Sequence, residues 1–133
     1  MEEYLYQRQV PHKTVEEAVA AIKAALSHHQ FGVLWDLDIN EKLVEKGIEP
    51  EPACRILEVC SAPRAKQALA VDQKAGYFLP CKVVVYEDRK THAVTVGFVK
   101  PRVLMGLSHI AQLEPLADEV HQLLQAAVDE VAD

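Results

Sequence analysis

The sequence lacks the features by which nucleotide-binding and nucleic-acid-binding proteins are commonly identified. Its five glycines are scattered along the chain, so no glycine-rich loop is available to hold a phosphate. No run of lysine and arginine occurs, and the formal net charge is −6. A protein that binds the phosphate backbone would present a basic face instead, so we expect no nucleic-acid partner.

Signals for export and for membrane insertion are also missing. No apolar stretch approaches the roughly 18 to 20 residues that a membrane-spanning helix needs. The first residues, "MEEYLYQRQV", have neither the basic start nor the apolar centre of a signal peptide. Three cysteines are an odd number, which argues against a disulfide framework in a chain with no export signal. These absences predict a cytoplasmic protein with no membrane partner.

Catalytic and metal-binding motifs are absent as well. The chain contains no C-x-x-C, no H-x-x-x-H and no G-x-S-x-G sequence. His28 and His29 are adjacent, so on a helix they would point about 100° apart and should not face one ion. His109 and His121 are too far apart to share an ion on one helix. We therefore expect no metal site and no cofactor.

What the sequence does contain is enough apolar material for a sizeable core. Half of its 133 residues are hydrophobic, which is typical of a globular chain and not of a disordered one. The length predicts a single domain over residues 1–133.

Two long helices are predicted from apolar residues at helical spacing. Thr14 and Glu17 form a capping box before the first, which runs to the glycine at position 32. The second lies in residues 113–131, and at least one of Leu123 and Leu124 should be fully buried in the middle of its apolar stripe. Two shorter helices are predicted in residues 40–47, with Asn40 as the N-cap, and in residues 61–72, with Ser61 as the N-cap.

Alternating or β-branched runs predict five strands, which lie in residues 4–10, 33–39, 53–60, 81–88 and 93–100. The last two should form a hairpin across the polar turn "RKTH". The order of elements predicts an α+β fold with two layers, in which a mostly antiparallel sheet of about five strands carries the two long helices on one face.

The predicted strands are apolar at both alternating sets of positions. Val83 and Val85 share one set with Val94, whereas Val84 and Tyr86 occupy the other. Since two long helices cover only one face, the second face needs another cover. A second copy of the chain is the simplest cover, so we expect a homodimer.

One candidate site comes from Cys60, Pro63, Pro80 and Cys81. Cys60 ends a predicted strand at the start of a helix, where the helix dipole favours a thiolate, and Cys81 follows Pro80 at the start of another strand. If these strands are antiparallel neighbours, the two sulfurs share one edge of the sheet; if they are parallel, the sulfurs lie at opposite edges. The site could bind a small molecule, or the thiols could serve an enzyme or a redox protein. Both cysteines could equally be small core residues.

Two weaker features complete the candidates. Asp36 and Asp38 lie on the same face of a predicted strand, an arrangement that suits acid and base chemistry but is more typical of a polar sheet surface. Residues 101–110, "PRVLMGLSHI", should line a pocket or, as we favour, pack under the last helix.

Three segments resemble a known family. They are "TVEEAVAAIKAALSHHQFGVLWDLDI", "ILEVCSAPRAKQAL" and "AGYFLPCKVVVYED", and in this order and spacing they are similar to the bacterial and archaeal family called domain of unknown function 302. The most specific part is Cys60 with Pro63, followed by Leu79-Pro80-Cys81 before an apolar strand. The family usually has proline two residues after the first cysteine, whereas this sequence has it three residues after. The resemblance implies a compact α+β fold, a homodimer and a cytoplasmic protein, and it implies no particular reaction.

Overall fold

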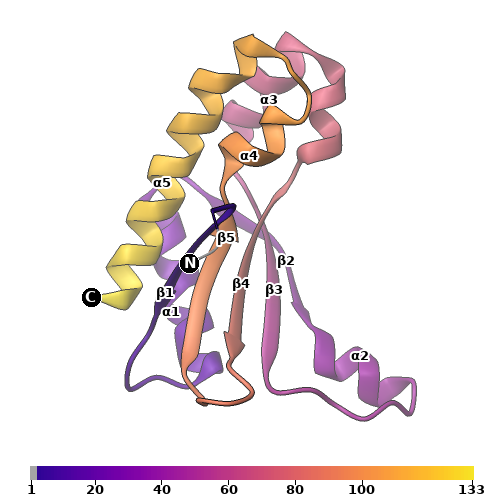
Figure 1. Ribbon diagram of the computed structural model, residues 1–133, viewed down its shortest axis with the longest axis vertical. Helices are drawn as coiled ribbons and strands as arrows, with labels where there is room; N and C mark the ends of the chain where they lie inside the picture. The colour runs from indigo at the N-terminus through magenta and orange to yellow at the C-terminus, as the bar shows by residue number, and fades with distance from the viewer. Residues whose placement is uncertain (1–2) are drawn as a thin grey trace.

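Figure 1 shows a computed structural model of the protein, which describes residues 3–133. The elements follow one another as β1 (Leu5–Gln9), α1 (Val15–His28), β2 (Gly32–Asp38), α2 (Ile39–Glu45), β3 (Cys54–Cys60), α3 (Ala62–Val71), the 3-10 turn η1 (Gln73–Phe78), β4 (Cys81–Glu87), β5 (Val94–Val99), α4 (Pro101–Gly106), the 3-10 turn η2 (Ala111–Leu113) and α5 (Glu114–Ala132).

The five strands form one sheet in the order β1-β5-β4-β3-β2, and every neighbouring pair is antiparallel. Strands β3, β4 and β5 are neighbours in space as well as in sequence. Strand β1 lies at one edge beside β5, and β2 lies at the other edge beside β3. The predicted α+β fold with an antiparallel sheet of five strands is confirmed.

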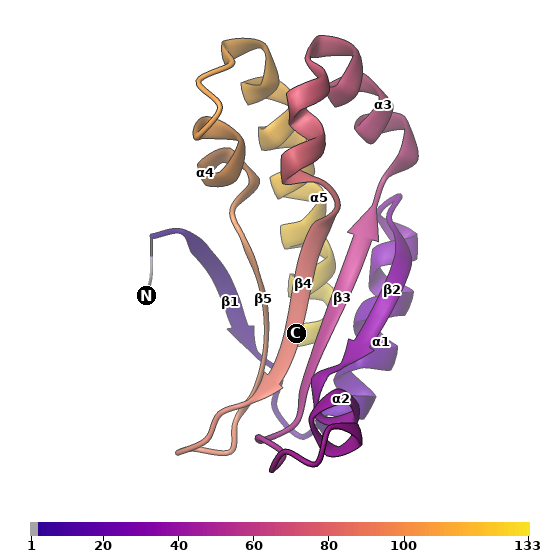
Figure 2. The same cartoon turned by 90° about the vertical axis from the view of Figure 1, so that its right-hand side faces the viewer.

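Both long helices pack on the same face of the sheet, where they lie behind the strands in Figure 2. Helix α1 begins with the predicted capping box: the Glu17 amide donates to Thr14 Oγ1 at 3.1 Å, and the Thr14 amide donates to Glu17 Oε1 at 2.9 Å. These bonds satisfy amides that a helix start otherwise leaves unpaired. The capping prediction is confirmed.

The main core lies between these helices and the sheet. Leu57, Val59, Val83 and Val85 of β3 and β4 are fully buried beneath them. In α5, Leu124 is 1% exposed, whereas Leu123 is only partly buried. The prediction that one of these two leucines is fully buried is confirmed.

A second, smaller core lies beyond the end of the sheet, where α3, η1, α4 and the start of α5 meet. Its fully or nearly fully buried members are Ala68, Ala75, Met105, Leu113 and Ala117. We call this part of the molecule the head. The sequence predicted α3 but not α4, because Pro101 and five further residues make too short a run for helical periodicity to be read. Met105 packs beneath α5, as favoured for this segment.

One predicted N-cap is wrong, and the other is confirmed in position but makes no capping bond. Asp38, not Asn40, caps α2, with Asp38 Oδ1 accepting from the Asn40 amide at 3.0 Å. Ser61 occupies the N-cap position of α3 but makes no capping bond; its hydroxyl accepts from Arg64 Nη1 at 3.1 Å. The Asn40 side chain instead contacts the Glu51 backbone, whereas Ser61 contacts Arg64 within the first turn of α3.

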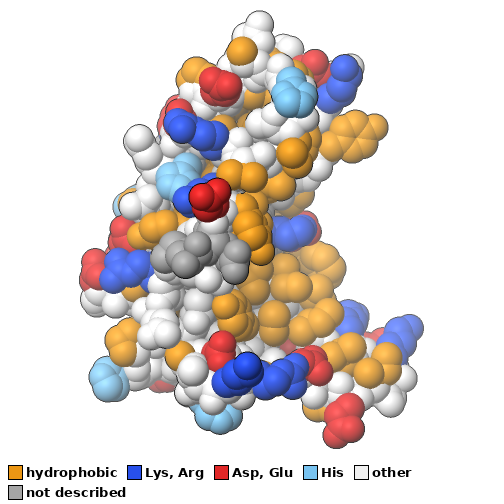
Figure 3. Space-filling view, viewed as in Figure 1, with side chains coloured by type: hydrophobic (Ala, Val, Ile, Leu, Met, Phe, Trp, Pro, Cys, Tyr) orange, Lys and Arg blue, Asp and Glu red, His pale blue; other side chains and the backbone are white. Residues whose placement is uncertain are grey.

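The other face of the sheet carries no helix. Apolar side chains gather over it in a hollow on the right of Figure 3, bounded by the head above and by α2 below. Partly exposed members are Leu37, Cys54, Ile56, Val84 and Tyr86, and Trp35 is 52% exposed. We call this surface the open face.

Candidate functional site

The two cysteines of the candidate site lie at the same end of the sheet. Cys60 is the last residue of β3, Cys81 is the first residue of β4, and the antiparallel register places Cys81 opposite Val59. The alternative in which the two strands are parallel is thereby excluded. Neither cysteine forms a disulfide, and both are partly buried.

A small cavity separates the sheet from α3 at this end. Its volume is about 20 Å³, and Cys60, Cys81, Ala68 and Met105 are among the residues that line it. This is space for about one water molecule. Arg64 closes one side, because its guanidinium donates to Glu119 Oε1 at 2.7 Å and to Gln30 Oε1 at 2.9 Å. With a volume of about 20 Å³, the cavity is too small for any ligand larger than a water molecule.

A larger pocket opens on the other side of Cys81. Its volume is about 310 Å³, and it lies between η1, the start of β4, the end of β5 and α4. The lining side chains are mainly apolar: Tyr77, Phe78, Leu79, Pro80, Cys81, Lys82, Val99, Pro101, Leu104 and Met105. We call this the head pocket.

The backbone around Pro80 shapes one wall of the head pocket. The Leu79–Pro80 peptide bond is cis, and Pro80 leads directly into Cys81 and the first ladder contacts of β4. The opposite wall comes from α4, in which Pro101 occupies the first turn, where no amide donor is needed. Two short elements, η1 just before β4 and α4 just after β5, thus build the pocket.

The four predicted site residues have different positions in this arrangement. Cys81 lines both the cavity and the head pocket, Pro80 lines only the pocket, and Cys60 lines only the cavity. Pro63 is exposed in the first turn of α3 and lines neither. The structure therefore brings Cys60, Pro80 and Cys81 together and leaves Pro63 outside. Leu104 and Met105 of α4 also line the pocket, which is the alternative that the sequence analysis named for residues 101–110 but did not favour.

Burial controls the chemistry of Cys81. It raises the pKa of this thiol to about 11, and the neighbouring Cys60 adds to the increase. A low dielectric disfavours the charged thiolate, so Cys81 is a neutral thiol at physiological pH. Burial also raises the pKa of Cys54, on the open face.

The paired aspartates have a structural role at the edge of the covered face. Asp36 accepts from Arg55 Nε at 2.9 Å and lies 2.6 Å from Lys23 Nζ of α1. These cations lower the pKa of Asp36 to about 2, with the Arg55 hydrogen bonds as the largest cause. Asp38 caps α2. Neither carboxylate is arranged as one half of an acid and base pair.

The side chains of His28 and His29 do not point apart, as the sequence analysis expected for two adjacent residues of a helix. His28 Nδ1 and His29 Nε2 both contact the carboxylate of Glu130, at 2.9 and 3.2 Å. They reach one partner because α1 ends at His28, so His29 no longer follows helical geometry. Within residues 3–133, no group of three or more His, Cys, Asp or Glu side chains is placed to hold a metal ion.

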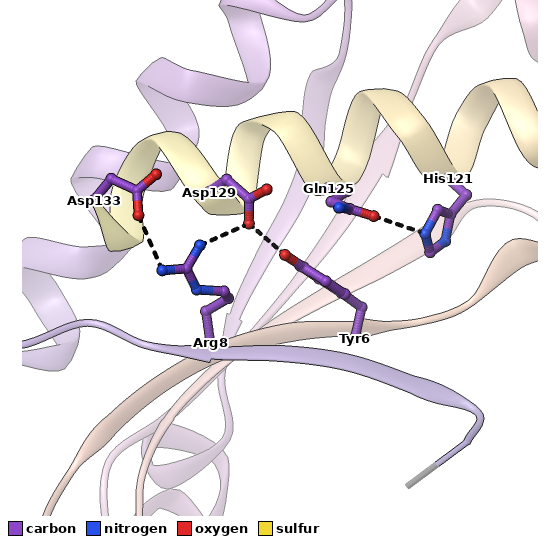
Figure 4. Close-up of polar contacts among 6 residues, drawn as sticks. All are labelled: Tyr6, Arg8, His121, Gln125, Asp129 and Asp133. Atoms are coloured by element: carbon purple, nitrogen blue, oxygen red, sulfur yellow. Dashed lines mark hydrogen bonds and ion pairs between the residues drawn. The ribbon is translucent and has the colours of Figure 1, made fainter. Parts of the chain in front are cut away.

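A polar seam joins β1 to α5 along the other edge of the covered face (Figure 4). Tyr6 and Arg8 both donate to Asp129 Oδ1, and Arg8 also donates to Asp133 at 2.9 Å. Burial and the Asp129 carboxylate raise the pKa of Tyr6. His121 packs edge-on against the Tyr6 ring at 6.2 Å. These contacts hold the first strand against the last helix.

Comparisons with known proteins agree with this architecture. The model of the family described as "Domain of unknown function DUF302" matches residues 6–131. A crystal structure of an uncharacterized conserved DUF302 protein from Bacillus stearothermophilus is 32% identical, with a TM-score of 0.90, over 97% of this chain and 98% of the other. No match was found among curated proteins. In the described part of the chain, no helix is both long and apolar enough to cross a membrane. From the family match and the similarity in structure, we conclude that this chain belongs to the DUF302 family.

Proposed function

We propose that this protein binds a small, largely apolar molecule in the head pocket. The observation that carries the proposal is the pocket itself, whose volume of about 310 Å³ lies at the lower end of the range for small-molecule sites. Its walls consist mainly of apolar side chains, which come from η1 and the start of β4 on one side and from α4 on the other. Pro80 and Cys81 would contact the ligand, and Cys60, which lines the small cavity beside Cys81, would support the wall from behind. Pro63, exposed at the start of α3, would take no part.

Titration with anilinonaphthalene sulfonate, an anionic dye whose aromatic rings bind apolar sites, tests this proposal. Leu104 lines the pocket, so Leu104→Arg should fill it and weaken dye binding at least about ten-fold. Val103 is adjacent, 41% exposed and not part of the lining, so Val103→Arg is the matched control and should bind the dye as the native protein does. Equal dye affinity in both variants would rule out the head pocket as the site.

We propose further that the functional form is a homodimer of single-domain chains, which pack their open faces together. The support is the row of partly exposed apolar residues on a sheet face that no helix of the same chain covers. Sedimentation at low micromolar concentration should give twice the chain mass of 14.8 kDa. A species of 14.8 kDa under these conditions would contradict the dimer.

A thiol-dependent enzyme or redox protein that uses Cys60 and Cys81 is the second candidate. It is favoured by one observation, that both cysteines line the same cavity. The raised pKa of Cys81 weighs against it, because the nucleophile would be the thiolate. The rate of alkylation, measured against pH, decides between the ligand-binding protein and the thiol enzyme. For Cys81 this rate should rise only toward pH 11, whereas an apparent pKa below about 7 at either cysteine would favour the thiol enzyme.

We also propose that the protein is cytoplasmic, because unpaired thiols are stable in that compartment.

A further inference from the structure

Helix α2 and the loop after it project from the sheet and contain no fully buried residue. No residue of α2 is buried, and Val44 and Ile48 are 60% and 54% exposed. A short helix with exposed apolar side chains gains little stability from its own packing. We call residues 39–52 the arm, and its apolar side chains need an explanation outside the single chain.

Hydrogen bonds help to hold the arm in place. Gly47 has a φ of 71°, and the Ile48 amide donates to the Leu43 carbonyl at 2.8 Å, which is the pattern of a Schellman C-cap. Asn40 fixes the returning loop, because its side chain donates to the Glu51 carbonyl at 2.7 Å and accepts from the Glu51 amide at 2.9 Å. The arm is thus an ordered projection that presents Val44 and Ile48 to its surroundings.

The arm and the head pocket lie at opposite ends of the open face. The arm follows the end of β2, whereas the pocket is built where β4 begins and β5 ends, one full strand length away. In Figure 1 the arm and the head both extend to the right, beyond the strands and away from α5. Figure 3 shows the apolar hollow between them. If two open faces meet about a two-fold axis perpendicular to the strands, each arm meets the head of the other chain.

The charges of the two ends are complementary. Residues 40–52 carry four glutamates and two lysines, a net charge of −2. Within the chain, Glu45 pairs with Lys42 and Glu51 pairs with Arg89. Residues 73–82 and 99–107, which surround the head pocket, carry three lysines, one arginine and no acidic residue. Lys82 and Arg102 already pair with Glu58 and Asp118 at 2.8 and 2.7 Å. Lys74 makes no ion pair with any other described residue, which leaves it available to an acidic partner.

We infer that the arm of a second copy closes the head pocket, so that Val44 and Ile48 of one chain complete the apolar binding site of the other. This inference rests on the proposed dimer and the proposed ligand site, and it adds the direction of packing and the residues that the partner contributes. In a symmetric dimer each of the two arms covers one of the two head pockets, so no arm and no pocket is left without a partner. Glutamates of the arm, such as Glu45 and Glu49, lie beside Lys74 of the other chain in this arrangement.

Cross-linking of the native protein with a carbodiimide, which joins a carboxylate to an amine without a spacer, tests the contact. An equal mixture of unlabelled and isotopically heavy chains distinguishes links between chains from links within one chain. Links between Glu45 or Glu49 and Lys74 should join light to heavy chains. A dimer by sedimentation whose arm links only to the arm of the other chain would overturn the inference while leaving the dimer intact. A monomer by sedimentation would overturn both.

A pair of substitutions at Ile48 gives an independent test. Ile48→Asp places a charge in the inferred contact, and it should weaken both dimerisation and binding of anilinonaphthalene sulfonate at least about ten-fold. Ile48→Val, the conservative control, should leave both unchanged. Because Ile48 is exposed in the single chain, both variants should retain the native circular dichroism spectrum. Native dimerisation with native dye affinity in Ile48→Asp would overturn the inference.

Discussion

The two faces of the sheet differ far more in their surroundings than in their residues. On β4, Val83 and Val85 are fully buried beneath the helices, whereas Val84 between them is partly exposed on the open face. Three consecutive valines therefore meet two environments. Apolar residues on a strand therefore do not by themselves show which face of this sheet stabilises the fold. Within one chain, a valine is buried only where the helices cover it. The following predictions test that difference.

The largest expected effect is in the layer between the sheet and α5. Leu124 is 1% exposed and packs in the main core, so Leu124→Ala should lower the free energy of unfolding by about 2 to 5 kcal/mol. Urea denaturation followed by circular dichroism measures the change. A loss below about 0.5 kcal/mol, which is a typical surface value, would show that the covered face is not the main source of stability.

A matched pair on β4 compares the two faces directly. Val85→Thr buries a hydroxyl beneath the helices and should cost about 1 to 3 kcal/mol. Val84→Thr makes the same change on the open face and should cost less than about 0.5 kcal/mol in the unfolding of the single chain. Unfolding measured at several protein concentrations separates this value from any effect on association. Equal costs at the two positions would remove the distinction between the faces.

An effect smaller than that of Val85→Thr is expected at the polar edge of the covered face. The folded state lowers the pKa of Asp36 from 3.8 to about 2, so the ionised carboxylate contributes stability above pH 3.8 that is lost as the pH falls toward 2. The side chain is 19% exposed, and we expect a loss of about 1 to 2 kcal/mol across this window. Asp36→Asn should lack this part of the acid sensitivity. The same slope in both proteins between pH 4 and pH 2 would show that the ion pairs with Arg55 and Lys23 do not stabilise the fold.

Much of the fold could be predicted from the sequence, because local rules govern it. The capping box at Thr14 and the apolar stripe around Leu124 each lie within one helix. The β-branched runs identify strands, and two helical stripes for five strands predict that one sheet face lacks a helix. These patterns depend only on neighbours along the chain.

The candidate site was less predictable, because it depends on contacts between distant segments. Twenty residues separate Cys60 from Cys81. That length allows either an antiparallel return or a crossover, so only the structure shows that the cysteines share one end of the sheet. The head pocket needs α4, which is too short for periodicity to reveal, and its lining depends on how η1 and α4 face each other. Likewise, Asn40 contacts the backbone of the more distant Glu51 where the local sequence predicts a helix cap.

The position of β1 has a consequence for how the chain is made. This strand is synthesised first, yet its sole neighbour in the sheet is β5, and Tyr6 and Arg8 bind a carboxylate of Asp129, more than 120 positions later. On a ribosome, β1 therefore waits unpaired until β5 has emerged, while β3 and β4 can already pair with each other. The contacts of β1 with α5 form later still, and a nascent chain that stops short of β5 keeps β1 unpaired and its partly apolar side chains uncovered.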